Sequence, residues 1–543
     1  MGDKTKFIII TGGVLSGLGK GVAAASIGHL LSSNLRVIPV KCDGYLNTDP
    51  GTMNPIEHGE VFVLDDGGEV DMDFGHYERF LDVECKSEWN LTMGKVFKKI
   101  LEKERRGDFL GGTVQFIPHV TDTIKDSLKE IAHNEKADIL LVEIGGTVGD
   151  LENELYIEAV RQLGQEKDDN DVVYIHLTYV PIPENTGEQK SKPSQQSVKL
   201  LNERGIFPDI LIGRCSEPLE EKIKNKIALF CNLPRHAVIS GVDVSTVYKI
   251  PLFYDEDGMT EIFHKELAIY SPPDLSDWTR LVRHIEKPSK NVTLAISGKY
   301  TELKDSYASI IEALAHAGAH LDAKVDIKWI ETTDIEKSPE KLDDLLEDVN
   351  GVIVPGGFGT RGIEGKIEII RYVRENDIPF LGICYGMQLA VIEFARNVCE
   401  IGGANTSEVE DDGCEVDIPI VCILESQKKV KQKGGTMRLG GQDVKIKPHT
   451  RANKIYGKTK IRERFRHRYE INPEYIGKLE KKGMIFSGHH PKEKIKQIME
   501  IPGHRFYIGT QFHPELKSTL KKPAPLFYHL VEAAITSKTI HKP

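Results

Sequence analysis

A cysteine stands at the centre of a short, glycine-flanked segment in the C-terminal half of the chain. Residues 380–388 read FLGICYGMQ, so Cys384 follows an apolar run and precedes a helix-like stretch. A sharp strand-to-helix turn of this kind exposes its central side chain and places it at a helix N-terminus, where the dipole favours a thiolate. Cys384 is therefore a candidate nucleophile, although a buried cysteine in a tight turn would show the same pattern.

Two further segments could complete a nucleophilic site. Gly356 and Gly357 follow an apolar run, and a glycine-rich loop after a strand can present backbone N–H groups to an oxyanion. Far downstream, the string QFHPE places His513 two residues before Glu515. His513 could accept the thiol proton while Glu515 fixes the imidazole tautomer. Each feature is weak alone, but the three together predict acyl-transfer chemistry.

In this order, PGGFG, GICYGMQ and QFHPE resemble the class I glutamine amidotransferases, over about residues 291–535. The resemblance implies that Cys384 attacks the side-chain amide of glutamine. It also implies that His513 acts as base and then as acid, and that Glu515 orients it. Gly357 and the N–H of Tyr385 would form the oxyanion hole.

The N-terminal half opens with a glycine-rich loop. Residues 11–21 read TGGVLSGLGKG directly after an apolar run. Such glycines let backbone amides face phosphate oxygens, and Lys20 adds a cation. The match to a Walker loop is imperfect, because Val14 stands at the first glycine position and Gly21 replaces the Ser or Thr that ligates magnesium. The loop therefore predicts phosphate binding without the usual metal-binding hydroxyl.

Acidic and basic side chains elsewhere in this half could complete a nucleotide site. Asp73, in Asp71-Met72-Asp73, is expected on an extended segment with both acids on one face, and Glu143 ends the apolar run 138–142. Mg²⁺ binds one or two carboxylates together with phosphate oxygens, so Asp73 and Glu143 are the predicted ligands. Lys190 and Lys192 could grip a triphosphate. Solvated acids and an exposed charged loop are the alternatives for these segments.

Alternating strand-like and helix-like segments must position these groups. Apolar runs predict strands at 7–10, 36–40, 139–142, 172–177, 210–212, 292–296, 352–354, 379–382 and 505–509, and periodic segments predict helices at 23–33 and 121–134. This alternation predicts two α/β domains, each a doubly wound parallel sheet. We expect a synthetase domain at 1–267, a Pro-rich linker at 268–290 with a helix at 276–284, an amidotransferase domain at 291–535 and a tail at 536–543.

The overall composition limits the partners. The formal net charge is −11 and the pI about 6.0, which argues against binding to nucleic acid or anionic membranes. The eight cysteines show no metal-binding spacing, which is typical of reduced thiols. No apolar run reaches the roughly 18 residues of a membrane span. We therefore expect a cytoplasmic protein.

Six more strings occur in the order found in the CTP synthases: KCDGYLNTDPGTMNPIEHGEVFV, GHYERF, VEIGGTVGD, HLTYVP, KIALFC and GGTMRLG. This resemblance spans nearly the whole chain. It implies a ligase in which ATP phosphorylates O4 of UTP and ammonia displaces that phosphate to give CTP. It also implies GTP as allosteric activator, CTP as feedback inhibitor, a homotetramer and, in some members, filaments.

The resemblance also assigns roles to residues at matching positions. Lys20 and Lys41 would act beside the transferred phosphoryl group, and Asp73 and Glu143 would hold Mg²⁺. The ATP-binding positions are Gly17, Leu18, Gly19, Lys20, Gly21, Val22, Asp73, Arg214, Val242, Asp243 and Val244. The UTP- or CTP-binding positions are Ser16, Asp150, Leu151, Glu152, Glu158, Lys190, Lys192, Gln195 and Lys226. The glutamine-binding positions are Gly357, Tyr385, Gly386, Met387, Gln388, Glu408 and Arg468. His58 and Val61 match the ammonia passage, and residues 434–440 resemble a lid associated with GTP.

The sequence departs from the CTP synthases at two places. Residues 153–156 read NELY, where a small or apolar residue followed by Pro-Phe is more common, and Gln189 replaces an apolar residue. Two other functions compete with the main hypothesis. A cobyrinic-acid-type amide synthase also joins a P-loop to a glutaminase-like domain, but the lysine loop and GGTMRLG argue against it. A ParA-like ATP switch with a vestigial glutaminase is disfavoured by the intact Cys384, His513 and Glu515.

Overall fold

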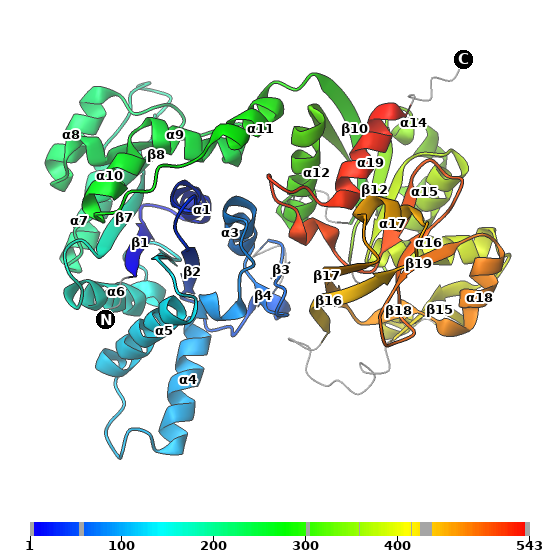
Figure 1. Cartoon of the computed structure of the whole chain (residues 1–543), viewed down its shortest axis with the longest axis horizontal. Coiled ribbons are helices and arrows are strands. Elements are labelled where there is room, and N and C mark those ends of the chain that lie inside the picture. Colours follow the sequence, from blue (N-terminus) through cyan, green and yellow to red (C-terminus); the bar gives the residue numbers. More distant parts are fainter. Residues whose placement is uncertain are drawn as a thin grey trace. The chain divides into compact units, whose positions relative to one another are not determined.

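The computed structural model describes residues 5–53, 59–299, 304–357, 359–413, 415–423 and 437–537. Its contacts divide the chain into two compact units, each built around its own sheet (Figure 1). The first unit is Met1–Pro50 with Asp73–Val282, and the second is Gly51–Met72 with Arg283–Pro543. Residues 51–72 thus fold with the second unit although the first unit surrounds them in sequence.

A parallel sheet forms the centre of the first unit, in the order β5-β2-β6-β1-β7-β8-β9. The strands are β1 (Lys6–Gly12), β2 (Val37–Asp43), β5 (Asn90–Thr92), β6 (Ile139–Ile144), β7 (Val172–Tyr179), β8 (Ile210–Cys215) and β9 (Val238–Val242). β2 and β6 are buried along their whole length, which explains why they occur as continuous apolar runs. The five strands predicted in this half are confirmed.

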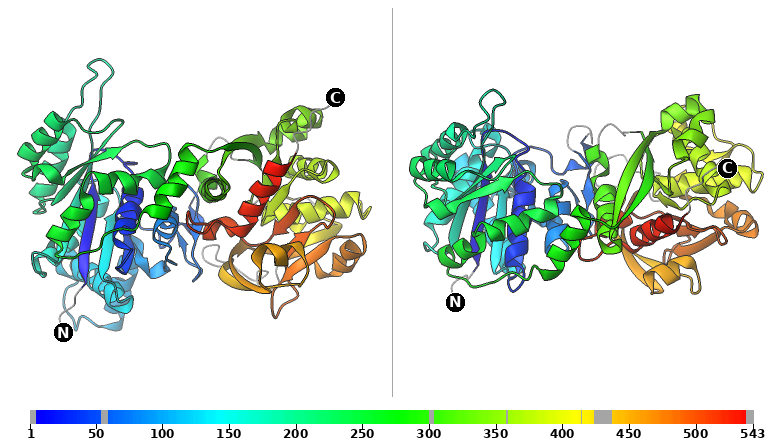
Figure 2. Two further views of the ribbon diagram at one scale, coloured as in Figure 1. Left: turned by 45° about the horizontal axis from the view of Figure 1, so that its top comes forward. Right: turned by 90° about the horizontal axis from the view of Figure 1, so that it is seen from above.

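Helices cover both faces of this sheet (Figure 2). They are α1 (Lys20–Leu31), α3 (Asp73–Leu81), α4 (Met93–Arg106), α5 (Thr121–Asn134), α6 (Glu154–Gln165), α7 (Lys192–Glu203), α8 (Glu221–Cys231), α9 (Ile250–Glu256), α10 (Met259–Glu266) and α11 (Ser276–Glu286). α1 packs against α3 and α9, whereas α5 packs against α6. The result is the doubly wound α/β arrangement predicted from the sequence. No helix among the described residues is long and apolar enough to cross a bilayer.

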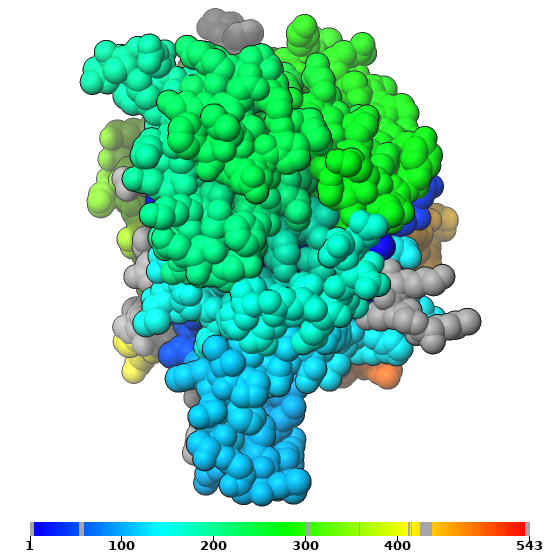
Figure 3. Space-filling model, turned by 90° about the vertical axis from the view of Figure 1, so that its left-hand side faces the viewer, coloured from blue at the N-terminus to red at the C-terminus, as the bar shows by residue number. Residues whose placement is uncertain are grey.

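One part of the first unit carries several exposed apolar side chains. α4 and the loop after it project at the bottom of the face drawn in Figure 3. Leu101, Leu110 and Phe116 are 62%, 95% and 64% exposed in this region. Large apolar side chains gathered on a projecting element are typical of a contact surface.

A mixed sheet forms the centre of the second unit, in the order β11-β10-β12-β13-β21-β20-β19-β16-β17. The first five strands in this order, β11, β10, β12, β13 and β21, pair in parallel. The other four, β20, β19, β16 and β17, extend the sheet by antiparallel pairing. The strands are β10 (Lys290–Gly298), β11 (Ala323–Glu331), β12 (Gly351–Val354), β13 (Phe380–Ile383), β16 (Arg438–Ile446), β17 (Lys460–His467), β19 (Ile485–His489), β20 (Lys496–Glu500) and β21 (Tyr507–Thr510). The strands predicted at 292–296, 352–354, 379–382 and 505–509 are confirmed.

Helices and two small sheets complete the second unit. The helices are α12 (Ala308–Leu321), α13 (Thr332–Lys337), α14 (Leu342–Leu346), α15 (Ile363–Glu375), α16 (Tyr385–Asn397), α17 (Arg451–Tyr456), α18 (Pro473–Lys481) and α19 (Pro525–Thr536). The small sheets are a hairpin of β3 (Phe62–Val63) with β4 (Glu69–Val70), and β14 (Ala404–Thr406), β15 (Ile418–Ile423) and β18 (Tyr469–Ile471). α12 packs with α19 and α15 packs with α16.

Candidate functional site

Cys384 is the single residue between the end of β13 and the start of α16. Its backbone has φ 51° and ψ −100°, a conformation that side-chain-bearing residues rarely adopt. Its N–H donates to the carbonyl of Thr510 at 2.6 Å, which ties the turn to β21. Gly386 is also required, because a Cβ there would overlap the carbonyl of Val354. The sharp turn expected from the sequence is therefore present.

His513 and Glu515 lie beside this turn. Nδ1 of His513 and Oε1 of Glu515 are 2.7 Å apart. A Cβ on Gly356 would lie 2.9 Å from Cε1 of His513 and 3.6 Å from Cβ of Cys384, so the glycine loop contacts both residues. Burial lowers the pKa of His513, but the negative charges of Glu515 and Cys384 outweigh it and raise that pKa to about 10. This favours a positively charged imidazolium at His513.

A cavity of about 270 Å³ opens at Cys384 within the second unit. Its lining includes Val61, Gly356, Gly357, Cys384, His513 and Glu515. Nucleophile, base and oxyanion loop thus face one space, which can hold an amino-acid side chain. Val61, one of the two residues expected along the ammonia passage, lies in the same lining. His58, the other, lies outside the described residues.

The expected glutamine contacts fall into two groups. Glu408 accepts a hydrogen bond from the N–H of Gly359 at 2.7 Å, and the Tyr385 hydroxyl donates to the carbonyl of Gly359 at 3.2 Å, so both border the glycine loop. Gly386 and Met387 instead pack behind the turn, against Val354 and Gly509. Arg468 lies between β17 and β18.

A glutamine that the sequence analysis missed touches the nucleophile directly. The side-chain amide of Gln511 donates to Sγ of Cys384 at 3.5 Å. Gln388 in turn donates to Oε1 of Gln511 at 3.1 Å and to the carbonyl of Tyr469 at 3.0 Å. The signal was available, because Gln511 opens the same QFHPE string that supplied His513.

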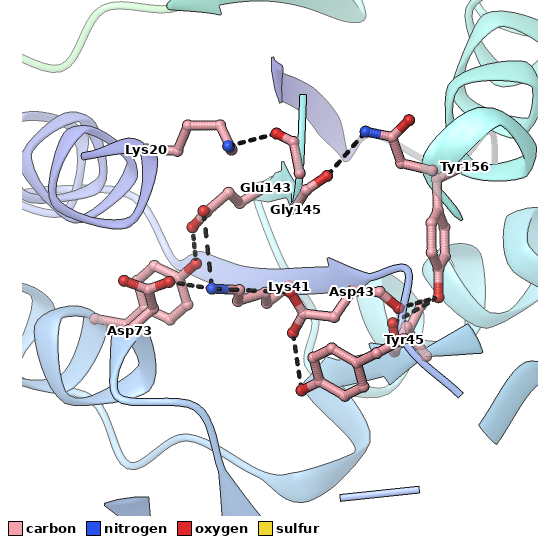
Figure 4. A network of polar contacts seen from close by, with 12 residues as sticks. Lys20, Lys41, Asp43, Tyr45, Asp73, Glu143, Gly145 and Tyr156 are labelled. Atoms are coloured by element: carbon pink, nitrogen blue, oxygen red, sulfur yellow. Dashed lines mark hydrogen bonds and ion pairs between the residues drawn. The ribbon is translucent and has the colours of Figure 1, made fainter. Parts of the chain in front are cut away.

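The phosphate loop of the first unit connects β1 to α1. Val14, Gly17 and Gly19 have φ values of 79°, 74° and 83°, so the loop turns through several left-handed conformations. Lys20 is the first residue of α1, and its Nζ donates to the carbonyl of Gly146 at 2.7 Å (Figure 4). Burial lowers the pKa of Lys20, and the charge of Glu143 opposes this shift.

Lys41 on β2 lies among three carboxylates (Figure 4). Its Nζ pairs with Asp73 and lies 3.9 Å from Oδ1 of Asp43 and 4.0 Å from Oε1 of Glu143. Burial raises the pKa of Glu143. Burial also acts on Asp73, but the charge of Lys41 outweighs it and holds the pKa of Asp73 below its usual value. The ends of β2 and β6 and the start of α3 thus form one charged cluster beside the phosphate loop.

The structure corrects the expected position of Asp73. It is the first residue of α3 and does not lie on an extended segment, because the helix begins two residues after Asp71. A Cβ on Gly21 would overlap the Asp73 carboxylate. Asp73 therefore occupies the space of the Ser or Thr side chain of a Walker loop, which explains why glycine stands at position 21.

Gly21→Ala is expected to displace the Asp73 carboxylate. Since displacing a reacting group by about 1 Å costs roughly a hundredfold in rate, phosphoryl transfer at this loop should slow by about that factor. Steady-state release of ADP from ATP measures the effect. Gly477→Ala is the matched control, because it lies in α18 and a Cβ there meets no atom within 4 Å. Full activity of Gly21→Ala would contradict the fit of Asp73 against Gly21.

Residues expected to bind ATP line a cavity of about 150 Å³. They include Leu18, Gly19, Val22, Arg214, Val242, Asp243 and Val244. Arg214 joins the two sides, since Nη1 donates to the carbonyl of Leu18 and Nε donates to Oδ1 of Asp243, both at 2.9 Å. The structure thus brings the phosphate loop and the segment after β9 together.

Another cavity, of about 510 Å³, is lined by four residues expected at the UTP or CTP site, namely Lys190, Lys192, Gln195 and Lys226. Lys222 and Phe230 also line it and were missed. Their spacing of four residues on either side of Lys226 on α8 was the available signal. Not every expected residue joins a cavity: Ser16 and Leu151 are exposed, and Glu158 pairs with Arg161 within α6 at 2.8 Å.

The residues that depart from the common pattern make polar contacts. The side chain of Asn153 donates to the carbonyls of Gly145 at 3.1 Å and Thr147 at 2.9 Å. The hydroxyl of Tyr156 donates to the carbonyl of Leu91 at 2.7 Å (Figure 4). Phenylalanine has no hydroxyl, so the bond from Tyr156 that ties α6 to β5 depends on the residue found in this chain.

Both halves of the chain match known families. Residues 6–269 match the model described as CTP synthase N-terminus, and residues 302–533 match that of class-I glutamine amidotransferases. A CTP synthase of Borreliella afzelii is 54% identical over 539 residues, which cover 98% of this chain and 100% of the relative. A CTP synthase of Archaeoglobus fulgidus is 49% identical over 531 residues, 98% of each chain. A solved structure of the glutaminase domain of a Trypanosoma brucei CTPS with bound acivicin is 33% identical, with a TM-score of 0.42, and the match covers 46% of this chain and 96% of that one. The chain belongs to the CTP synthase family.

Proposed function

We propose that the protein converts UTP to CTP, using ATP as phosphoryl donor and ammonia released from glutamine. The observation that carries this proposal is that one chain brings together two groups of residues, each suited to one of the two half-reactions. Cys384, His513 and Glu515 share one cavity, and Lys20, Lys41, Asp73 and Glu143 meet at the phosphate loop. The full-length likeness to CTP synthases favours this function over an amide synthase or an ATP switch.

The glutaminase half proceeds through a thioester. The Cys384 thiolate attacks the side-chain carbonyl carbon of glutamine, and the N–H groups of Gly357 and Tyr385 receive the oxyanion. His513 gives its proton to the departing ammonia while Glu515 holds the ring through Nδ1. Water then cleaves the thioester with His513 as base, and glutamate leaves. Gln511 keeps the sulfur in place through its bond to Sγ.

Asp73 and Glu143 fit a magnesium site. Their oxygens belong to the ligand class that Mg²⁺ prefers, and Asp73 stands where a Walker hydroxyl would reach the ion. The part of the chain that the structure describes holds no group of three or more His, Cys, Asp or Glu side chains able to hold a metal alone. Nucleotide phosphates would therefore complete the coordination. When bound, Mg²⁺ would neutralise charge on the transferred phosphoryl group.

The synthetase half activates UTP before amination. O4 of UTP attacks the γ-phosphorus of ATP and ADP leaves, with Lys20 and Lys41 neutralising charge on the phosphoryl oxygens. Ammonia then adds to C4 and loses a proton to solvent, and phosphate leaves with the original O4. The lysine-lined cavity at Lys190, Lys192 and Lys226 suits the triphosphate of UTP. CTP as feedback inhibitor would use Asp150, Leu151 and Glu152, and Glu152 packs against Gly44 at the end of β2.

We expect the protein to form a homotetramer and to be activated by GTP, as the CTP synthase family implies. The exposed Leu101, Leu110 and Phe116 support a homotetramer, since assembly would remove them from water. GTP activation would act through residues 434–440, of which 437–440 are described. Gly440 packs against Gly67 in the turn of the β3–β4 hairpin, and Val63 of the same hairpin lines the glutaminase cavity. Filament formation and the cytoplasmic location stay predictions from the sequence.

The proposed function is tested by supplying two nitrogen sources to the purified protein. With ATP, UTP and Mg²⁺, both glutamine and ammonium chloride should give CTP, measured by chromatography of the nucleotides. No CTP from either source would refute the proposal. CTP from ammonium alone would retain the synthetase half and refute the glutaminase half.

A further inference from the structure

A buried lysine lines the cavity at Cys384 and has no part in the reaction described so far. Lys366 lies on α15 and is 2% exposed. It shares the cavity lining with Cys384 and Gly357. Among the described residues, its amine makes neither an ion pair nor a hydrogen bond. Burying an ammonium group without such a partner is costly, so this position needs a reason.

The amine of Lys366 lies near both residues expected to form the oxyanion hole. Its Nζ lies 5.3 Å from the centre of the Tyr385 ring, within the range of a cation–π contact. The same Nζ lies 3.9 Å from the position that a Cβ on Gly357 would take. Tyr385 follows the nucleophile directly, and Gly357 belongs to the glycine loop. A positive charge therefore lies over the side chain of Tyr385 and close to the backbone of Gly357.

The surroundings of Lys366 bring the pKa of its amine close to neutral pH. Burial lowers the pKa of Lys366 and Lys299 at the end of β10 lowers it further, while Glu331, Glu408 and Glu336 raise it. The result is a pKa of about 8. The amine is then mostly charged at pH 7 and loses its charge as the pH rises through 8.

We infer that Lys366 is a positioning residue for glutamine hydrolysis, which places a buried positive charge behind the oxyanion hole formed by Gly357 and Tyr385. When the Cys384 sulfur bonds to the amide carbon, the π electrons of the carbonyl move onto oxygen. When the intermediate collapses, the C–N bond breaks and His513 supplies the proton to ammonia. The charge of Lys366 stabilises the amide oxygen only while that oxygen carries a negative charge.

This inference rests on the proposed glutaminase role of Cys384 and makes a distinct kinetic prediction. Lys366→Met should lower kcat for glutamine hydrolysis about tenfold to a hundredfold, because removing one oxyanion-hole donor costs a hundredfold or more and Lys366 acts through those donors. KM for glutamine should stay within about twofold, since neutral substrate gains little from the charge. Lys366→Arg retains the charge and should recover most of the lost rate.

A matched control lies on the same helix. Arg371 is 45% exposed and pairs with Glu368 at 2.8 Å on the outer side of α15. Like Lys366→Met, Arg371→Met replaces one cation by a methionine. Because Arg371 lies outside the cavity lining, its glutaminase kcat should equal that of the wild type. Melting temperatures of all variants report on folding.

The pH profile separates a charge effect from a structural one. The wild-type glutaminase rate should fall as the pH rises through about 8, and Lys366→Met should lack this limb. Glu60, Arg466, His513 and Glu515 also line the cavity, but they are present in both proteins and cannot account for the difference. The wild-type profile remains informative even if Lys366→Met fails to fold.

A second probe uses the γ-aldehyde of glutamate, which adds to Cys384 and forms an oxygen anion in the same hole. Lys366→Met should bind this aldehyde about tenfold more weakly and bind glutamate as the wild type does. Unchanged kcat and KM would overturn the inference and would indicate that Lys366 acts on no part of the substrate. A raised KM with unchanged kcat would also overturn it and would indicate that Lys366 binds the α-carboxylate. A wild-type protein without glutaminase activity would instead refute the proposed function itself.

Discussion

Cys384→Ala is expected to abolish CTP formation from glutamine while CTP formation from ammonium continues at the wild-type rate. The sulfur is the only atom at the turn that can form the thioester, so its loss should reduce the glutamine-dependent rate by roughly 10⁴-fold or more. The residues proposed to phosphorylate UTP belong to the first unit, and Cys384 does not. Parallel assays with glutamine and with ammonium chloride measure both rates.

Cys399→Ala is the matched control for this experiment. Cys399 follows α16, the helix that starts at the nucleophilic turn, and it is half-buried. Its replacement should leave both rates unchanged. Equal loss of both activities in Cys384→Ala would contradict two separate reaction centres in this chain.

Lys20→Ala is expected to remove CTP formation with either nitrogen source. Lys20 begins α1 beside the phosphate loop, and its amine lies near Glu143, Lys41 and Asp73. Without this cation, charge on the transferred phosphoryl group is neutralised less well, and cations in this role contribute roughly 10³-fold or more to the rate. Release of ADP from ATP and UTP, measured without any nitrogen source, should fall in parallel.

An exposed lysine of the first unit supplies the control for Lys20. Lys265 on α10 is 67% exposed and lies 3.3 Å from Glu266. Lys265→Ala should form CTP at the wild-type rate with a similar melting temperature. Substantial CTP synthesis by Lys20→Ala would refute the phosphate role of Lys20.

Much of this architecture could be predicted because its signals are local. β1 and β6 are buried on both faces, so the sequence carries unbroken apolar runs where they lie. The turn at Cys384 could be predicted for a similar reason, since Gly382 and Gly386 are the residues that such close packing requires. His513 and Glu515 were found through one short string.

Other features depend on contacts between distant segments and could not be predicted. The fit of Asp73 against Gly21 joins residues 52 positions apart, and nothing local distinguishes this aspartate from a solvated one. Residues 51–72 fold with the second unit, although the segments before and after them in the sequence belong to the first. Lys366 stands in a helix rich in charged residues, where a lysine normally faces solvent. Burial beside Gly357 gives it a different environment.

Nitrogen from glutamine is expected to replace O4 of UTP after that oxygen has been phosphorylated. The most direct measurement combines glutamine labelled with ¹⁵N in its amide and UTP labelled with ¹⁸O at O4. Mass spectrometry of the products should find ¹⁵N at C4 of CTP and ¹⁸O in inorganic phosphate. If the phosphate carries no ¹⁸O while CTP is formed, O4 does not leave as phosphate and the account is contradicted.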